Sequence, residues 1–216
     1  MTHLLEFKDG KSEPLGTFYC VGRNYEAHAR EMGAAPGDAP VIFIKPPSAY
    51  LPPELPFRIP AISKQVQHEV ELVAMVGGRD DTLHVAAVAV GMDMTLRDLQ
   101  RAAKERGEPW AVSKGFRGSA PLSPFIRIKD VPCALAELSI ELSRDGQTVQ
   151  KGRVAEMRWG VAELISHIDS IFGLAPGDCI FTGTPDGVGP VHPGERFTAS
   201  LCFGQQVLTS RVLEVR

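Results

Sequence analysis

The chain has 216 residues, of which 44% are hydrophobic and 23% charged, so it is long enough to enclose a hydrophobic core as one domain, residues 1–216. Its 23 Lys and Arg residues against 26 Asp and Glu residues give a net charge of −3, without a basic cluster. The charge therefore gives no reason to expect a nucleic acid or a membrane as partner, and it favours a small-molecule ligand.

The cysteines and the N-terminus indicate the compartment. The four cysteines occur singly in apolar segments, with no Cys-X-X-Cys pair and no Cys/His spacing typical of zinc sites. This pattern favours buried thiols in a reducing compartment over disulfides. The N-terminal MTHLLEFKDGK lacks the long apolar region of a signal peptide, and no window approaches transmembrane length. We therefore expect a cytoplasmic protein.

The first predicted strand, FYCV, is followed by a segment, RNYEAHAREMG, that predicts a short helix with Asn24 near its N-cap. His28 and Glu31 stand three residues apart and can face each other on this helix. A carboxylate in that position would orient the imidazole for general-base catalysis. A solvated pair on a surface helix is the alternative, and the spacing alone favours it.

Two acidic residues interrupt the apolar segment HEVELVAM, residues 68–75. In a strand, Glu69 and Glu71 share one face with Val73 and Met75, while the other face is apolar. Their Cα atoms would be about 6.6 Å apart along the strand. At an effective dielectric constant near 20 their repulsion is about 2 kcal/mol, so a strand buried on both faces needs something that neutralises them.

The next predicted strand, Val85–Met92, ends at Asp93, after which Thr95 and Asp98 predict a capping box for a helix ending near Gly107. If the two strands are neighbours, Glu69, Glu71 and Asp93 converge. Three carboxylates suit Mg²⁺, Mn²⁺ or Ca²⁺ and argue against zinc. The alternative, in which the glutamates pair with basic residues and Asp93 only caps the helix, is equally compatible with the spacing.

The rest of the chain predicts mainly strands and turns. Two hairpins are expected, one across Asp145-Gly146 and one around Gly204, with a further strand in CIFTGT. VAELISHIDSIF, residues 161–172, has the period of an amphipathic helix, with its apolar stripe ending in Ile171 and Phe172. Together with 17 prolines and 21 glycines, these elements predict a β-rich α+β fold with few short helices.

Two loop segments could contribute to a site. Lys114, in WAVSKGFRGSAP, could present an ammonium group to an anionic substrate, although a surface lysine is the alternative. TGTPDGVG has no spacing typical of a nucleotide-binding loop, but it could form a wall of a small site.

Taken together, several segments resemble the fumarylacetoacetate hydrolase family over nearly the whole chain, and most closely its short acylpyruvase and oxaloacetate decarboxylase type members. The segments that carry the resemblance are CVGRNYEAHAREM, IKPPSAY, HEVELVAMVG, GMDMTLRDLQ, WAVSKGF and GDCIFTGTPDGVGPV. The resemblance implies a mixed β-roll or sandwich of the family's C-terminal domain type, usually as a homodimer.

The resemblance also implies roles for individual residues. It makes Glu69, Glu71 and Asp93 the metal ligands, with Arg97 supporting the ligand aspartate. The other implied residues are the catalytic His28, Glu31 and Lys114 and the substrate-binding Arg23, Asn24 and Thr184.

The activity implied is carbon–carbon bond hydrolysis in an acylpyruvate-type 2,4-dioxo acid. His28, backed by Glu31, would activate water, and Mg²⁺ or Mn²⁺ would stabilise the enolate that is released. A metal-dependent decarboxylase or isomerase of a 2-oxo acid such as oxaloacetate is the alternative. A binding module that retains 2-oxo acids without converting them is a further alternative, which a His/Glu pair argues against because binding needs no base.

Overall fold

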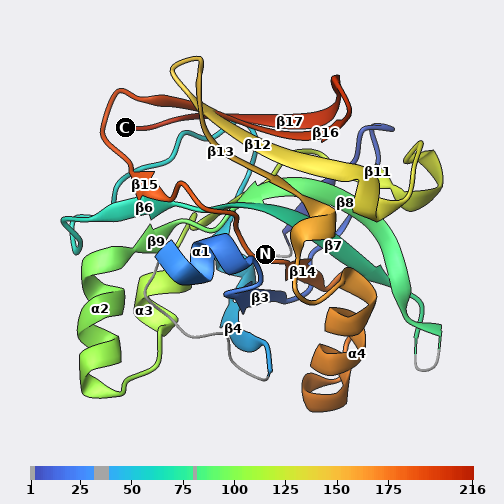
Figure 1. Ribbon diagram of the computed structural model, residues 1–216, viewed down its shortest axis with the longest axis horizontal. Helices are drawn as coiled ribbons and strands as arrows, with labels where there is room; N and C mark the ends of the chain where they lie inside the picture. Colours follow the sequence, from blue (N-terminus) through green and yellow to red (C-terminus); the bar gives the residue numbers. More distant parts are fainter. Residues whose placement is uncertain (1–2, 32–38, 80–81) are drawn as a thin grey trace.

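The structure is a computed structural model that describes residues 3–31, 39–79 and 82–216, with only the backbone for Ala29 and Glu31. Figure 1 shows a β-rich molecule in which one sheet lies across another and short helices surround them. The predicted β-rich α+β class is therefore confirmed.

The strands are β1 (Leu4–Glu6), β2 (Ser12–Pro14), β3 (Phe18–Gly22), β4 (Val41–Lys45), β5 (Tyr50–Leu51), β6 (Val66–His68), β7 (Val70–Gly77), β8 (His84–Met92), β9 (Thr95–Leu96), β10 (Ala120–Pro121), β11 (Ile126–Arg127), β12 (Leu138–Arg144), β13 (Gln147–Arg153), β14 (Cys179–Phe181), β15 (Gly189–Pro190), β16 (Arg196–Phe203) and β17 (Gln206–Glu214). The α-helices are α1 (Glu26–Glu31), α2 (Arg97–Arg106), α3 (Ala111–Lys114) and α4 (Val161–Phe172). The 3₁₀ segments are η1 (Pro47–Ala49), η3 (Ile128–Asp130), η4 (Leu135–Glu137) and η5 (Val154–Glu156).

The central sheet has six strands in the order β11-β8-β7-β14-β3-β4. It is a mixed sheet, because β14 runs parallel to β3, whereas every other pair of neighbouring strands in the sheet is antiparallel. β7 and β8 are joined with Val70 opposite Met92. This register brings the start of β7 to the end of β8, which is where the acidic residues lie.

The alternation predicted for β7 is confirmed by the two hydrophobic cores. Val70, Leu72 and two further residues of one face belong to the larger core, whereas Val73 and Met75 belong to the smaller core on the other side. The strand is buried along its whole length. Both faces of the sheet are therefore covered, as the nearly continuous apolar sequence requires.

A second sheet, in the order β13-β12-β16-β17, covers one face of β7 and β8 (Figure 1). Both predicted hairpins are present. Asp145 and Gly146 have φ angles of 49° and 85°, which is the pair of positive values that a type I′ turn needs. Gly204 has a φ of 56° in the turn between β16 and β17.

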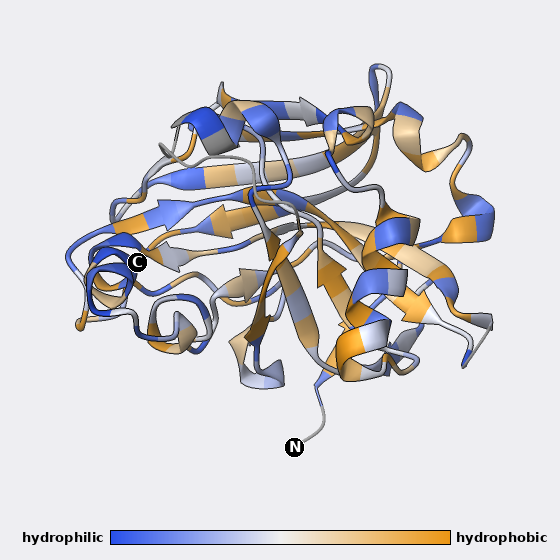
Figure 2. Cartoon of the chain, turned by 60° about the horizontal axis from the view of Figure 1, so that its bottom comes forward, coloured by the Kyte–Doolittle hydropathy of each residue, from blue (hydrophilic) through white to orange (hydrophobic). Residues whose placement is uncertain are grey.

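Helix α4 has the predicted bounds and buries Val161, Leu164 and Ile168, but the last turn of its apolar stripe is only partly covered. Ile171 is 57% exposed and Phe172 is 43% exposed. Phe172 nevertheless packs its ring against the core residue Tyr19, with ring centroids 5.3 Å apart. Figure 2 likewise shows alternating hydrophobic and hydrophilic residues along the helices and more continuous hydrophobic stretches along the central strands.

The predicted capping box at the start of α2 is also wrong. Thr95 lies in β9 and pairs with Gln67 of β6, so it is not available as an N-cap. The Asp98 carboxylate instead accepts hydrogen bonds from Ser63 Oγ at 2.6 Å and Lys64 N at 2.8 Å, which ties a loop to the helix. The helix does end at Gly107, whose φ of 67° closes it in the left-handed conformation. Across the described ranges, no helix is both long and apolar enough to span a membrane.

Candidate metal centre and cavity

Three carboxylates meet where β7 begins and β8 ends. Glu69 lies between β6 and β7, Glu71 lies in β7, and Asp93 follows β8. The amide of Asp93 donates to the Glu69 carbonyl at 2.8 Å, which fixes the two chain segments side by side. One oxygen from each carboxylate lies within 4.8 Å of the others, and the three residues are only 5%, 2% and 1% exposed. The structure therefore confirms the prediction that these three residues converge.

Lysine 114 lies inside this cluster. Its Nζ donates to Glu69 Oε2 and Asp93 Oδ2, both at 2.6 Å, and to Thr95 Oγ1 at 2.7 Å. Lys114 ends helix α3 and is buried, so the alternative of a surface lysine is wrong. All three N–H donors are used by the protein, so the ammonium balances the carboxylates.

Arginine 97 supports a different acid from the one expected. Its guanidinium contacts Glu69 Oε1, and it also donates to Gln67 Oε1 at 2.5 Å and Gln100 Oε1 at 2.6 Å. The expected support of Asp93 by Arg97 is thus wrong. The Arg97 amide donates to the Gln65 carbonyl at 2.7 Å, which holds the start of α2 beside β6 and so near Glu69.

A second cation beside Asp93, besides Lys114, is Lys45, which sequence analysis missed. Lys45 ends β4 with no exposed surface, and its Nζ lies 2.8 Å from Asp93 Oδ1. It also donates to the carbonyl and hydroxyl of Ser119 at 3.1 and 2.9 Å. A signal was present in the sequence, because a lysine that ends the apolar run VIFIK has no solvent to face if that strand is buried.

Glu69 and Glu71 differ in how far neighbouring cations compensate their negative charge. Burial alone would raise the pKa of Glu69, but Lys114 and Arg97 outweigh it and hold that pKa well below its usual range. Burial, followed by the charges of Asp93 and Glu69, raises the pKa of Glu71 well above its usual range. Burial likewise opposes the charge of Lys114, but Asp93 and Glu69 raise its pKa. Glu71 is therefore the acid whose negative charge the protein itself compensates least.

These residues fit a divalent cation. Glu71 receives a hydrogen bond from the Gly183 amide at 2.7 Å, but none of the cations that pair with Glu69 and Asp93 forms an ion pair with it in the described part of the chain. Buried carboxylate oxygens without donors are unfavourable unless a cation compensates them. An all-oxygen set selects Mg²⁺, Mn²⁺ or Ca²⁺ rather than zinc.

The carboxylates form the floor of a cavity of about 50 Å³. His28, buried on α1, lines it together with Arg23, Lys114 and Thr184. The cavity thus joins most of the side chains that sequence analysis singled out. Glu31 is the last residue of α1, and its side chain lies outside the described residues, so its pairing with His28 stays a prediction.

The Thr184 hydroxyl is held by a residue that sequence analysis did not find. Gln150 Nε2 donates to Thr184 Oγ1 at 2.9 Å, so the hydroxyl proton of Thr184 can point elsewhere. The other end of the Gln150 amide accepts from Val70 N at 3.1 Å and from His68 Nδ1 at 2.9 Å. Because Gln150 belongs to β13, the second sheet positions this wall of the cavity.

Asparagine 24 lies apart from the cavity lining and is fully buried. Its Nδ2 donates to the carbonyls of Thr182 at 2.8 Å and Trp159 at 3.0 Å, and its Oδ1 accepts from Trp159 N at 2.8 Å. These bonds use both amide donors, so we infer that Asn24 fixes the start of α1 against β14.

Residues 17–212 match the family model described as fumarylacetoacetate (FAA) hydrolase C-terminal. The chain belongs to this family. The resemblance drawn from the sequence motifs is therefore confirmed, as is the fold it implied.

Relatives with named activities differ in reaction. The chain is 39% identical over 207 residues to an oxaloacetate tautomerase of Escherichia coli (strain K12), covering 93% of this chain and 94% of the relative. It is 36% identical over 204 residues to a mitochondrial oxaloacetate tautomerase of Homo sapiens, covering 88% and 92%. Among solved structures, fumarylpyruvate hydrolase from Pseudomonas aeruginosa in complex with Mn²⁺ and pyruvate has a TM-score of 0.91 and 37% identity, covering 99% of this chain and 95% of that one.

Proposed function

We propose that this protein is a divalent-metal-dependent enzyme that interconverts the enol and keto forms of a small 2-oxo acid, with oxaloacetate as its substrate. The observation that carries the proposal is a buried histidine in the same small cavity as three converging carboxylates. The named oxaloacetate tautomerases among its relatives support the choice of substrate.

The residues that would hold the cation are Glu69, Glu71 and Asp93. Bound there, a divalent cation supplies a Lewis acid that attracts the oxygens of a 2-oxo acid and offsets negative charge that develops on them. The chain's own part is to fix the carboxylates. Arg97 holds Glu69, Lys45 holds Asp93, and the Gly183 amide holds Glu71. The small cavity favours a substrate of a few carbon atoms.

In this reaction His28 would transfer a proton between C3 and the oxygen of C2. From the keto form, the imidazole takes a proton from C3, and the C–H electron pair becomes the C2–C3 double bond. The carbonyl π pair moves onto the oxygen of C2, which then takes the proton from the imidazolium. The reverse sequence gives the keto form, so His28 is general base and general acid in turn. The buried position of His28 keeps bulk water from competing for this proton.

Thr184 and Lys114 would position the substrate. The Thr184 hydroxyl accepts a bond from Gln150 and can donate its own proton to a substrate oxygen. Lys114 has its three donors engaged, so it would act on an anionic substrate through its charge.

Hydrolysis of a carbon–carbon bond in a 2,4-dioxo acid is the second candidate, and the likeness to fumarylpyruvate hydrolase favours it. His28 would then deprotonate a water molecule that attacks the distal carbonyl carbon, the C–C bond would break, and its electron pair would leave as an enolate. Loss of CO₂ from oxaloacetate would use the same charge stabilisation without a base. A binding module without turnover is disfavoured by the placement of His28 in the cavity.

A direct test follows the ultraviolet absorbance of the enol form of oxaloacetate after mixing it with chelator-treated protein and added Mg²⁺ or Mn²⁺. Enol decay above the rate with metal alone is the expected result. Cleavage of acetylpyruvate or fumarylpyruvate without accelerated enol decay would replace this proposal by the hydrolase. Inactivity toward all three compounds would reject both.

We also propose that the protein is a cytoplasmic homodimer with reduced cysteines. In the structure all four cysteines are free. Light scattering should give twice the mass of the 23.4 kDa chain, and thiol titration of the denatured protein should find four thiols. A monomer with oxidised cysteines would contradict this proposal.

A further inference from the structure

Two basic side chains that the reaction above does not use, Lys104 and Arg23, line the cavity on its more exposed side, which we call its mouth. Lys104 lies near the end of α2, and Arg23 lies just before α1; both line the cavity. The Lys104 ammonium lies over the Trp110 ring, 5.0 Å from its centroid, and Trp110 also lines the cavity. A cation–π contact of this kind restrains an otherwise flexible lysine.

Three polar residues on one face of helix α2 lie toward the cavity. Arg97, Gln100 and Lys104 follow the spacing of a helix face and all line the cavity. Arg97 at the first turn contacts Glu69, so this end of the row is at the carboxylates. Lys104 is about 10 Å further along the helix axis, and its side chain leans back toward the N-terminus as helical side chains do. The row therefore leads from the carboxylates to the mouth.

The two ends of this row differ in how their charges are balanced. Arg97 and Lys114 contact acids of the cluster. Among the residues that the structure describes, Lys104 and Arg23 have no carboxylate at ion-pair distance. Burial, followed by the charges of Arg97, Arg23 and Lys114, lowers the pKa of Lys104. Arg23 also has a φ of 63°, an unfavourable conformation for a side chain other than glycine.

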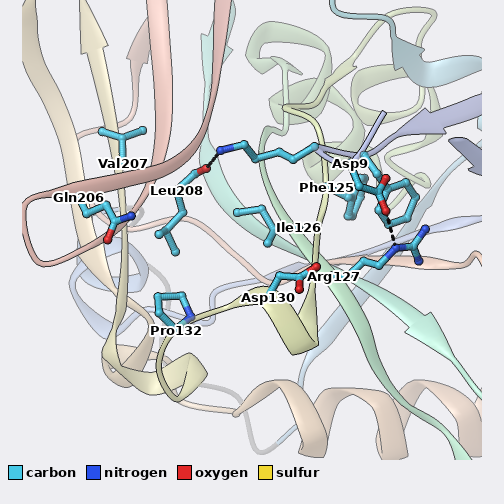
Figure 3. Close-up of a pocket in the computed structure, with 11 residues that line it drawn as sticks. Asp9, Phe125, Ile126, Arg127, Asp130, Pro132, Gln206, Val207 and Leu208 are labelled. Atoms are coloured by element: carbon cyan, nitrogen blue, oxygen red, sulfur yellow. Dashed lines mark hydrogen bonds and ion pairs between the residues drawn. The ribbon is translucent and has the colours of Figure 1, made fainter. Parts of the chain in front are cut away.

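In one larger hollow of the surface, the basic residues have partners within the protein. Figure 3 shows that hollow, of about 400 Å³, where Arg127 pairs with Asp9 at 3.0 Å. Arg127 also pairs with Glu13 at 2.9 Å, and Lys8 donates to the Leu208 carbonyl at 2.6 Å. Its cations have partners within the protein, so it offers no comparable place for an anion. The cavity mouth differs from this hollow in that its two cations have no carboxylate partner among the described residues.

We infer that Lys104 and Arg23 bind a second carboxylate of the substrate, at the end away from its 2-oxo acid group, and so select 2-oxo dicarboxylates over 2-oxo monocarboxylates. This inference rests on the proposed function and assigns Lys104 as a specificity residue. A carboxylate at the mouth neutralises two like charges that otherwise repel each other, while the cluster at the floor engages the 2-oxo acid end.

The test compares oxaloacetate with 2-oxobutanoate, in which a methyl group replaces the distal carboxylate and the C3 protons remain. NMR measures exchange of the C3 protons for deuterium above the rate with metal alone, for wild type, Lys104→Met and Lys104→Arg. Arg106→Gln is the control, since Arg106 is on the same helix, is exposed and pairs with Glu108.

For Lys104→Met we expect kcat/KM to fall about fivefold on oxaloacetate, mainly through KM, because one exposed ion pair at the mouth is a modest interaction. On 2-oxobutanoate it should change less than about twofold, within the range of surface substitutions. Lys104→Arg should restore most of the preference, and Arg106→Gln should match wild type.

Equal losses on both substrates, or no loss on either, would overturn the inference while the proposed function stands, because the wild type would still exchange both. If the wild type exchanges neither, the proposed function fails and the inference fails with it. If Lys104→Met and Arg106→Gln lowered the preference for oxaloacetate over 2-oxobutanoate equally, the effect would be one of net charge. This result would also overturn the inference.

Discussion

The ammonium of Lys114 lies 2.6 Å from Asp93 Oδ2, and at the same distance from Glu69 Oε2. It thus occupies a position between two of the three acids that we assign to a divalent cation. Two positive groups cannot both approach these oxygens without repulsion. The lysine therefore stabilises the cluster when no divalent cation is bound. It opposes the binding of a divalent cation to the same oxygens.

Lys114→Met should tighten Mn²⁺ binding about tenfold, because it removes a competing positive charge from a buried cluster. The same variant should lower the stability of the chelator-treated protein and abolish turnover. Calorimetric titration with Mn²⁺ measures the affinity. Lys129→Met, at an exposed position of η3, is the matched control. Weaker Mn²⁺ binding in Lys114→Met would mean that the lysine helps to position the ligands and does not compete with the cation.

Glu71 should make the metal-free protein less stable as pH rises. Its pKa in the folded protein is well above its usual value, so it stabilises the fold below the unfolded pKa, about 4.3, and this stabilisation is lost as pH rises through the folded pKa. Glu71→Gln removes the charge while keeping the shape. At pH 8 the melting temperature of the chelator-treated variant should exceed that of wild type. Each kcal/mol of gained unfolding free energy should raise it by about 2–4 °C.

The difference between the two melting temperatures should shrink at pH 5, and added Mg²⁺ should raise the melting temperature of wild type but not of Glu71→Gln. A variant that is less stable than wild type at pH 8 without metal would contradict this account of Glu71.

Lys45→Met should destabilise the fold by about 3–5 kcal/mol, the usual cost of removing one partner from a buried ion pair. Lys45 has no exposed surface, and the change leaves Asp93 Oδ1 without its nearest cation. Urea unfolding measures the loss. The double variant Lys45→Met with Asp93→Asn should recover part of it, because no uncompensated charge remains. Equal losses in the single and double variants would show that Lys45 acts through Ser119 and not through Asp93.

His28→Asn should lower enol–keto conversion of oxaloacetate by about 10²–10⁴ in kcat, the usual contribution of a general base. Loss of CO₂ from oxaloacetate needs charge stabilisation and no base, so the variant should retain it. Glu31→Gln should show the same pattern more weakly if it orients the imidazole. Both rates can be followed in one sample by enol absorbance and pyruvate formation. Equal losses in both reactions would assign His28 to substrate binding.

Local patterns in the sequence predicted much of the fold. The period-2 alternation of β7, the Asp145-Gly146 turn and the bounds of α4 follow from interactions between near neighbours in the chain, and all are present. The capping box at Thr95 failed because a long-range pairing with Gln67 in β6 took that residue into a strand. The exposure of Ile171 could not be predicted from the sequence, because it depends on where the core ends.

The site was predicted less completely for the same reason. Glu69, Glu71 and Asp93 could be brought together from two neighbouring strands, because their positions depend on one register. Lys45 and Gln150 come from β4 and from the second sheet, and no local spacing relates them to the acids. The partner of Arg97 depended on which acid its side chain could reach in three dimensions.

The central claim is that Glu69, Glu71 and Asp93 hold a divalent cation. Calorimetric titration of chelator-treated protein with Mn²⁺ tests it most directly, using wild type, Glu69→Ala, Asp93→Asn and, as control, Glu105→Gln at an exposed position of α2. We predict one ion per chain for wild type and the control. The two ligand variants should bind at least about 100-fold more weakly, the upper range of what losing even an outer-shell partner costs. Unchanged Mn²⁺ affinity in Glu69→Ala and Asp93→Asn would contradict the claim.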